Sequence, residues 1–144
     1  MGEPVIIEAA RTPIGKRGGH LSGVIAPKLL ASVQQEVLKR SGIEPEEVDQ
    51  IVGGCVTQAG QQASNVTRNA WLSTGKDYSP AATTIDCQCG SGAQANTFVQ
   101  GLIATGGAQI ALQPRLCLVQ ALQCAATAGA ISDRDTQDGA GGSS

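Results

Sequence analysis

Residues 81–107 read AATTIDCQCGSGAQANTFVQGLIATGG, and this stretch decides the fold class of the 144-residue chain. Its first part is rich in Thr and Ile and predicts a strand over 80–87, since β-branched side chains favour pleated backbone. From Ala95 to Ile103 apolar side chains recur at helical spacing, and Gly106-Gly107 follows. This pattern predicts a helix over 91–105. A strand and a helix are therefore expected to meet at the sequence Cys-Gly-Ser-Gly.

The same alternation continues on both sides of this stretch. Pro27 suits the first turn of a helix and Gly42 its end, while Ser64 is a candidate cap for another helix. The order β-α-β-α-β-α-β predicts an α/β layered sheet with right-handed crossovers. The predicted strands are 5–10, 50–56, 80–87 and 110–112, and the predicted helices are 27–40, 64–74 and 91–105.

The predicted helix 91–105 contains no charged residue. A helix that is small or apolar nearly all round is normally covered on more than one side. A single sheet covers only one side of it. The sequence therefore predicts a further layer over this helix.

The character of the chain changes after Leu112. Residues 113–122 are predicted to form a short helix, and 132–144, which are rich in Asp, Gly and Ser, are predicted to be disordered. We therefore divide the chain into a domain at 1–112 and a different, partly disordered tail at 113–144.

Composition excludes several functional classes. The net charge is −2, the ten Lys and Arg are scattered, and Trp71, Tyr78 and Phe98 are the only aromatic residues, so nucleic-acid binding is not expected. No apolar run approaches the roughly 18 residues of a membrane helix, and the first residues do not resemble a signal peptide. Five cysteines without a secretory signal favour reduced thiols and a cytoplasmic protein.

Cys89 is the candidate nucleophile. It is predicted to precede a helix, where free backbone N–H groups and the helix dipole favour the thiolate form. Its own N–H is suited to an oxyanion, and Gly90 and Gly92 are expected to let a bulky thioester approach. By spacing alone, a structural cysteine in a glycine-rich turn is an equally good interpretation.

Other sites receive less support. A metal or redox pair of Cys87 and Cys89 lacks partners, because His20 and the remaining cysteines show no ligand spacing. No metal is therefore predicted. The pattern GxGxxG is absent, which argues against a dinucleotide site.

Three segments together resemble a known family. EAARTPIGKRGG (8–19), IVGGCVTQAG (51–60) and TTIDCQCGSGAQAN (83–96) resemble the amino-terminal domain of thiolases, in matching order over about residues 3–112. The motif D-C-Q-C-G-S-G is similar to that of the bacterial branch that degrades steroid side chains.

The resemblance implies reversible thiolysis or Claisen condensation of 3-ketoacyl-CoA, with coenzyme A as substrate and no covalently bound cofactor. It implies that Cys89 carries the acyl group as a thioester, with its N–H in the oxyanion hole and with Gly90 and Ser91 near the substrate. Arg11 and Lys16 are candidates for the CoA phosphates, although solvation or a salt bridge explains them more simply. The family's subunit stacks two similar halves in five layers, with the helix after the nucleophile in the middle. The third strand would lie in a dimer interface, within a homodimer or homotetramer.

The departures from the family pattern are specific. Asp86 stands where many thiolases have Asn, and the sequence from Gln113 onward does not match. The family's Gly-His-Pro segment, with its activating histidine, and its second catalytic cysteine segment have no counterpart, and His20 matches neither. We therefore expect a truncated or frame-disrupted thiolase chain that is inactive alone. The alternative is a non-catalytic remnant or an oligomer-interface module.

Overall fold

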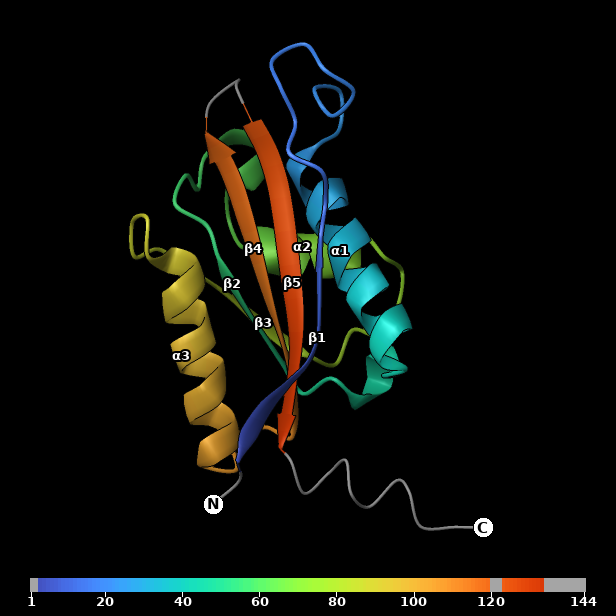
Figure 1. Ribbon diagram of the computed structural model, residues 1–144, viewed down its shortest axis with the longest axis vertical. Coiled ribbons are helices and arrows are strands. Elements are labelled where there is room, and N and C mark those ends of the chain that lie inside the picture. The colour runs from blue at the N-terminus through green and yellow to red at the C-terminus, as the bar shows by residue number, and fades with distance from the viewer. Residues whose placement is uncertain (1–2, 120–122, 134–144) are drawn as a thin grey trace.

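The computed structural model describes residues 3–119 and 123–133, and these residues form one five-stranded sheet (Figure 1). The strand order is β1-β5-β4-β2-β3. Strand β2 is parallel to β3 and β4, whereas β5 is antiparallel to both β1 and β4. The strands are β1 (Pro4–Arg11), β2 (Gln50–Gly54), β3 (Ala81–Ile85), β4 (Ile110–Val119) and β5 (Gln123–Asp133).

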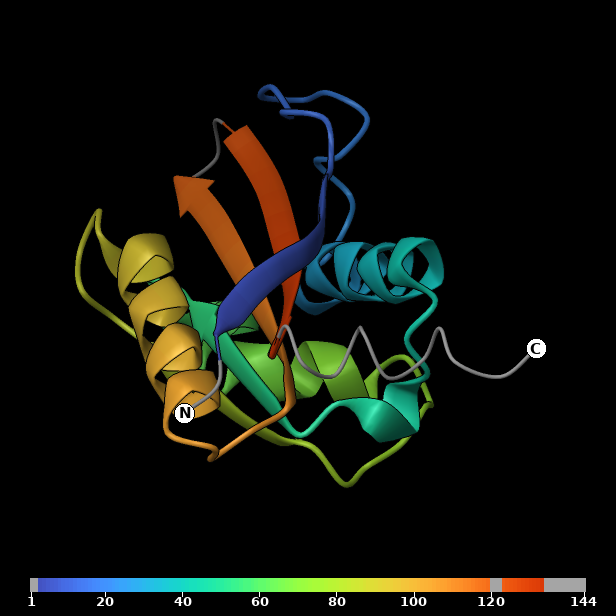
Figure 2. The same ribbon diagram turned by 60° about the horizontal axis from the view of Figure 1, so that its bottom comes forward.

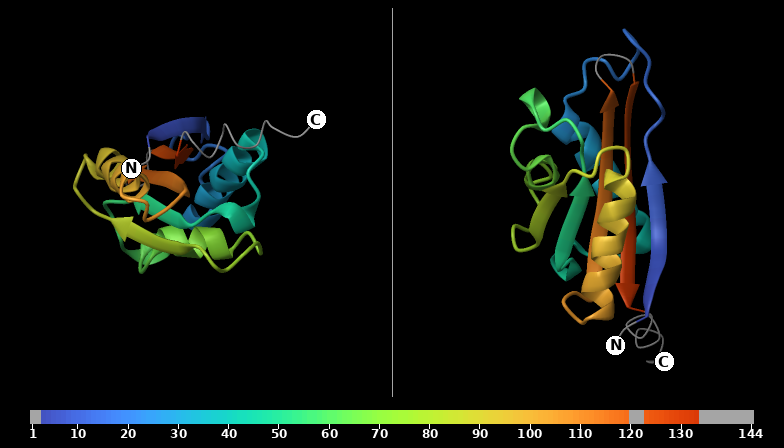
Figure 3. Two further views of the ribbon diagram at one scale, coloured as in Figure 1. Left: turned by 90° about the horizontal axis from the view of Figure 1, so that it is seen from below. Right: turned by 90° about the vertical axis from the view of Figure 1, so that its left-hand side faces the viewer.

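Three helices cover the two faces of this sheet. Helices α1 (Ala26–Ser41) and α2 (Val66–Leu72) lie on one face, and α3 (Ser91–Ala104) lies on the other (Figures 2 and 3). Two 3₁₀ turns, Pro45–Glu47 and Gly60–Gln62, complete the connections. The α/β layered architecture predicted from the sequence is confirmed.

Local sequence explains where α1 begins and ends. A proline stands in its first turn, and Gly42 terminates it in the left-handed conformation, with φ 69°, which glycine adopts without a Cβ clash. The apolar side chains Leu30, Val37 and Ile51 are fully buried with Trp71 between α1, α2 and the sheet. A smaller apolar cluster under α3 consists of Val52, Ala95, Val99, Ile103, Ala108, Ala111 and Ile131.

The predicted cap of α2 is wrong. Ser64 has a positive φ of 61° and lies outside the helix. Asn65 is the N-cap instead, and its side-chain oxygen accepts a hydrogen bond from the Arg68 N–H at 3.1 Å. Asparagine and serine are similarly good caps, so local sequence does not distinguish Ser64 from Asn65. The tertiary contacts of Asn65 decide which of the two caps the helix.

The predicted short helix over 113–122 is also wrong for the residues that the structure describes. Residues 110–119 continue as β4, which is paired with β5 from Ile110 to Val119. The prediction of only four strands is therefore corrected as well, because β5 lies between β1 and β4. Long-range pairing overrode local propensity here, as is common for strands.

The remaining part of the predicted disordered tail lies outside the described residues, apart from Ser132 and Asp133, which belong to β5. Ser132 is buried, with 1% of its surface exposed. The predicted disorder therefore does not apply to these two positions.

The outer surface of α3 is uncharged and uncovered by any described residue. Ala93, Thr97, Gln100 and Gly101 are exposed, and Phe98 exposes 50% of its surface. On edge strand β1, Ile6 exposes 67% of its surface. The further layer over α3 that the sequence predicts stays a prediction.

Candidate functional site

Cys89 lies in the connection between β3 and α3, two residues before the first residue of the helix. Its side chain is exposed. The preceding residue, Gln88, has a positive φ of 50°, an uncommon conformation for a residue with a Cβ. The chain therefore turns sharply just before Cys89 and presents the thiol at the start of α3.

Hydrogen bonds fix this connection at both ends. The Asp86 carboxylate accepts from the Gln88 N–H at 2.8 Å. The Ser91 hydroxyl accepts from the Cys87 N–H at 2.9 Å and donates to the Gln88 carbonyl at 2.6 Å. The Gly90 N–H donates to the Cys87 carbonyl at 3.0 Å. The thiol is thus carried by a loop whose backbone is held in place without it.

The bonding of Ser91 bears on its predicted role. Ser91 is 3% exposed, and its hydroxyl already serves the loop as both donor and acceptor. The hydroxyl therefore positions Cys89, and a direct contact of Ser91 with substrate stays a prediction. Gly90, which directly follows the thiol, is exposed and remains a candidate for substrate contact.

Two glycines let the sheet approach the start of α3 closely. A Cβ on Gly54 of β2 would lie 2.7 Å from the Ser91 carbonyl carbon. A Cβ on Gly92 would lie 2.6 Å from Cδ of Arg115 on β4. The expectation that Gly92 leaves room for a thioester is therefore wrong here, because the Arg115 side chain occupies that space.

A polar network ties α2 to β3, the strand that leads into the Cys89 loop. The Asn65 side-chain amide donates to the Ala82 carbonyl at 2.6 Å, and its oxygen accepts from the Thr84 hydroxyl at 2.7 Å. Thr84 also lies 2.8 Å from the Thr67 hydroxyl. Arg68 donates to the carbonyls of Pro80 and Tyr78. Edge strand β3 is consequently anchored by side chains in addition to its pairing with β2.

The other thiols differ in environment. Cys87 is exposed, whereas Cys55 is 2% exposed and its sulfur lies 3.2 Å from the Gln62 side-chain oxygen. His20 is exposed in the loop before α1. Among the residues described, no group of three or more His, Cys, Asp or Glu side chains is arranged to hold a metal ion.

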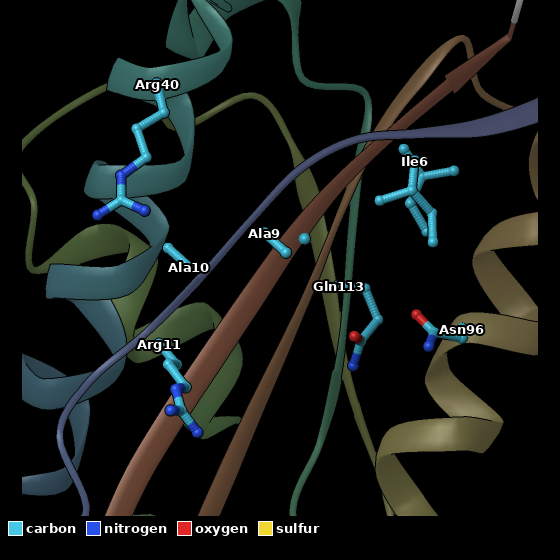
Figure 4. A pocket seen from close by; sticks show the side chains of 9 residues that line it. Ile6, Ala9, Ala10, Arg11, Arg40, Asn96 and Gln113 are labelled. Atoms are coloured by element: carbon cyan, nitrogen blue, oxygen red, sulfur yellow. The ribbon is translucent and has the colours of Figure 1, made fainter.

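A hollow of about 470 Å³ lies elsewhere, around edge strand β1. Figure 4 shows Arg40 of α1 on one side of the strand and Ile6, Gln113 and Asn96 on the other. Arg40 already forms an ion pair with Glu36 at 2.7 Å, a hydrogen bond that lowers the pKa of Glu36. None of the residues that line the hollow belongs to the Cys89 loop, so we do not assign the hollow to this site.

Comparison with known proteins identifies the chain. Residues 4–114 match the model of the thiolase N-terminal domain. The chain belongs to this family. It is 40% identical over 110 residues to the steroid 3-ketoacyl-CoA thiolase FadA6 of Mycobacterium tuberculosis, covering 76% of this chain and 27% of that protein. An acetyl-CoA acetyltransferase of Syntrophomonas wolfei is 40% identical over 108 residues, covering 75% of this chain and 27% of the relative.

The fold agrees with this assignment. The crystal structure of the Bacillus anthracis acetyl-CoA acetyltransferase superposes with a TM-score of 0.71 at 34% identity, covering 83% of this chain and 32% of that chain. The thiolase chain described here thus spans about a quarter of the length of its curated relatives. None of the helices in the described residues has the length and apolarity needed to cross a membrane.

Proposed function

We propose that this chain is the nucleophile-bearing part of a thiolase-type acyltransferase, with Cys89 as the acyl acceptor. One observation carries the proposal. An exposed thiol stands directly before a 14-residue helix, in a loop that backbone and Ser91 hydrogen bonds hold fixed. A helix N-terminus favours the anionic thiolate, which is the nucleophilic form.

The proposed chemistry is a two-step exchange on the Cys89 sulfur. The thiolate attacks the 3-keto carbonyl of a 3-ketoacyl-CoA, with the backbone N–H of Cys89 as one donor to the oxyanion. The bond between C2 and C3 of the substrate then breaks, the released acetyl-CoA carbanion takes a proton, and the shortened acyl group stays on sulfur. The thiolate of free coenzyme A next attacks this thioester and regenerates Cys89. Claisen condensation is the same sequence in reverse.

The acyl group is a finer proposal. The motif D-C-Q-C-G-S-G favours a steroid-type 3-ketoacyl-CoA. Overall identity does not separate the candidates, because the steroid thiolase and the acetyl-CoA acetyltransferase are both 40% identical to this chain, and an Escherichia coli beta-ketoadipyl-CoA thiolase is 42% identical. We therefore propose 3-ketoacyl-CoA as the substrate class and the steroid type as its first candidate.

The family match ends at residue 114, two residues beyond the boundary expected at 112. We also propose that the chain after residue 114 is foreign to the matched domain. Both amide atoms of Gln34, a fully buried residue of α1, lack a hydrogen-bond partner. Because α1 packs against β5, this mismatch supports a chain whose later residues were not selected together with its earlier ones.

Acylation of Cys89 is the direct test. We expect prolonged incubation of the chain with acetyl-CoA to add the mass of one acetyl group, lost again in hydroxylamine as a thioester would be. Cys89→Ala should abolish the adduct, and Cys87→Ala should retain it. An adduct that persists in Cys89→Ala, or no adduct at all, would contradict the proposal.

A second candidate function, an oligomer-interface module, rests on a different observation. Strand β3 is at the edge of the sheet and has a strand neighbour on one side only among the described residues, although the side chains of Asn65 and Arg68 bind the carbonyls of Ala82 and Pro80. Such an edge is a template for pairing with another chain. We propose that β3 pairs with β3 of a second copy. Thr83→Lys should then reduce a dimer seen by light scattering, and an unchanged dimer would exclude this edge.

A further inference from the structure

The side chain of Arg115 packs against the first turn of α3. Its Cδ would lie 2.6 Å and its Nε 3.1 Å from a Cβ on Gly92, which is in the first turn of the helix. Arg115 stands opposite Gly54 in the pairing of β2 with β4, and Gly54 in turn touches the Ser91 backbone. The arginine is thus packed against the same first turn that follows Cys89.

The charge of Arg115 is available to a molecule in solvent. The residue is exposed, and its guanidinium makes no hydrogen bond or ion pair with another described residue. Helix α3 has no acidic residue in its first turn. The acidic residue nearest to Cys89 in the sequence is Asp86, whose carboxylate accepts a hydrogen bond from the Gln88 N–H and keeps its negative charge. The guanidinium therefore adds a full positive charge to the partial positive charge of the helix N-terminus.

We propose that Arg115 is a specificity-determining residue that favours anionic electrophiles at Cys89 over neutral ones. The proposal rests on the proposed function only in taking Cys89 as the reacting thiol, and the favoured electrophiles are small molecules that bear a carboxylate or phosphate near their reacting carbon. Position 115 lies just beyond the residues that match the family model, 4–114, so the family match does not cover this arginine.

Two alkylating reagents of similar size distinguish the effect of the reagent's charge from the general reactivity of the Cys89 thiol. Iodoacetate carries a negative charge and iodoacetamide does not. The experiment measures both rate constants at Cys89 by peptide mass spectrometry on the intact 144-residue chain, and takes their ratio. A charge beside the first turn of α3, at a water-exposed site, is expected to change the encounter of an anion with Cys89 by a few-fold. We expect Arg115→Gln to lower the iodoacetate-to-iodoacetamide ratio about threefold or more.

Matched variants make the result specific. Arg115→Lys keeps the charge and should keep most of the ratio, while Lys39→Gln removes an exposed cation from α1, on the other face of the sheet, and should leave it unchanged. In the unsubstituted chain the ratio should also fall as salt rises from about 0.01 M to about 1 M, since the screening length shortens from about 30 Å to about 3 Å.

The alkylation experiment can fail or succeed independently of the acylation test with acetyl-CoA. An equal ratio in Arg115→Gln and the unsubstituted chain, or a ratio insensitive to salt, would overturn the role of Arg115 even if Cys89 accepts an acetyl group. A lowered ratio would support it even if Cys89 does not. Circular dichroism of each variant shows whether the sheet is intact, and the salt series requires no variant.

Discussion

At the scale of the residue, Cys55, Cys87 and Cys89 differ in their exposure to solvent. Cys89 and Cys87 are exposed on one loop, and Cys55 is buried beside Gln62. We expect iodoacetamide to modify Cys89 at least about tenfold faster than Cys55, because access and thiolate character both control thiol reactivity. Peptide mass spectrometry over a time course measures the rates.

Cys87 is the internal control for the helix effect. It shares the exposure of Cys89 but lies two residues further from α3. If Cys87 reacts as fast as Cys89, exposure alone explains the reactivity, and the argument from the helix N-terminus loses its support.

Replacement of Gln34 by an apolar residue is expected to stabilise the chain. It is fully buried, and neither amide atom has a hydrogen-bond partner. A buried polar group left unsatisfied costs about 1–3 kcal/mol, so Gln34→Leu should raise the unfolding free energy by about that amount. Urea unfolding followed by circular dichroism measures the change. Gln35→Leu, at the exposed neighbouring position, should change stability by less than about 0.5 kcal/mol.

At the scale of the element, Asn65 joins α2 to β3. It caps α2 through the Arg68 N–H and bonds the Ala82 carbonyl and the Thr84 hydroxyl. Asn65→Ala should destabilise the chain by about 1–2 kcal/mol, since a lost cap alone costs about 1 kcal/mol. Asn65→Ser keeps a cap acceptor, places no carboxylate against the Ala82 carbonyl, and should lose less. Equal losses for the two variants in thermal unfolding would show that the cap is not what stabilises this junction.

A second prediction at this scale concerns self-association through the outer face of α3. Phe98 is half exposed on a helix face without charge, and such a surface favours association. Phe98→Gln should reduce self-association in analytical ultracentrifugation. Tyr78→Gln is the control, because Tyr78 is 64% exposed but lies in the loop before β3. If both variants associate like the unsubstituted chain, the α3 face does not mediate association.

At the scale of the whole molecule, the chain spans 27% of each of the first two relatives and contains one histidine, His20. A strong acyl-transfer thiol normally has a neighbouring base, usually a histidine, and no histidine is among the residues of the Cys89 loop. We expect no measurable turnover when the 144-residue chain is given acetoacetyl-CoA and coenzyme A, even if a single acylation occurs. Steady formation of acetyl-CoA would show that the chain supplies its own base.

Local sequence was sufficient for the elements whose pattern is strong. The helix over 91–105 matches α3 within one residue, and the apolar stripe, Pro27 and Gly42 placed α1 within one residue at each end. The position of Cys89 between β3 and α3 followed from the same boundaries. These features depend on periodicity and caps, which neighbouring residues fix among themselves.

The sequence by itself therefore determined the layered α/β class, the family, and the thiol that precedes a helix. Only the tertiary structure decided that β5 lies between β1 and β4, that residues 113–119 extend instead of coiling, and that Arg115 fills the space beside Gly92. Strand order and side-chain contacts across the sheet join residues distant in sequence, and their energies arise from packing that no local pattern contains.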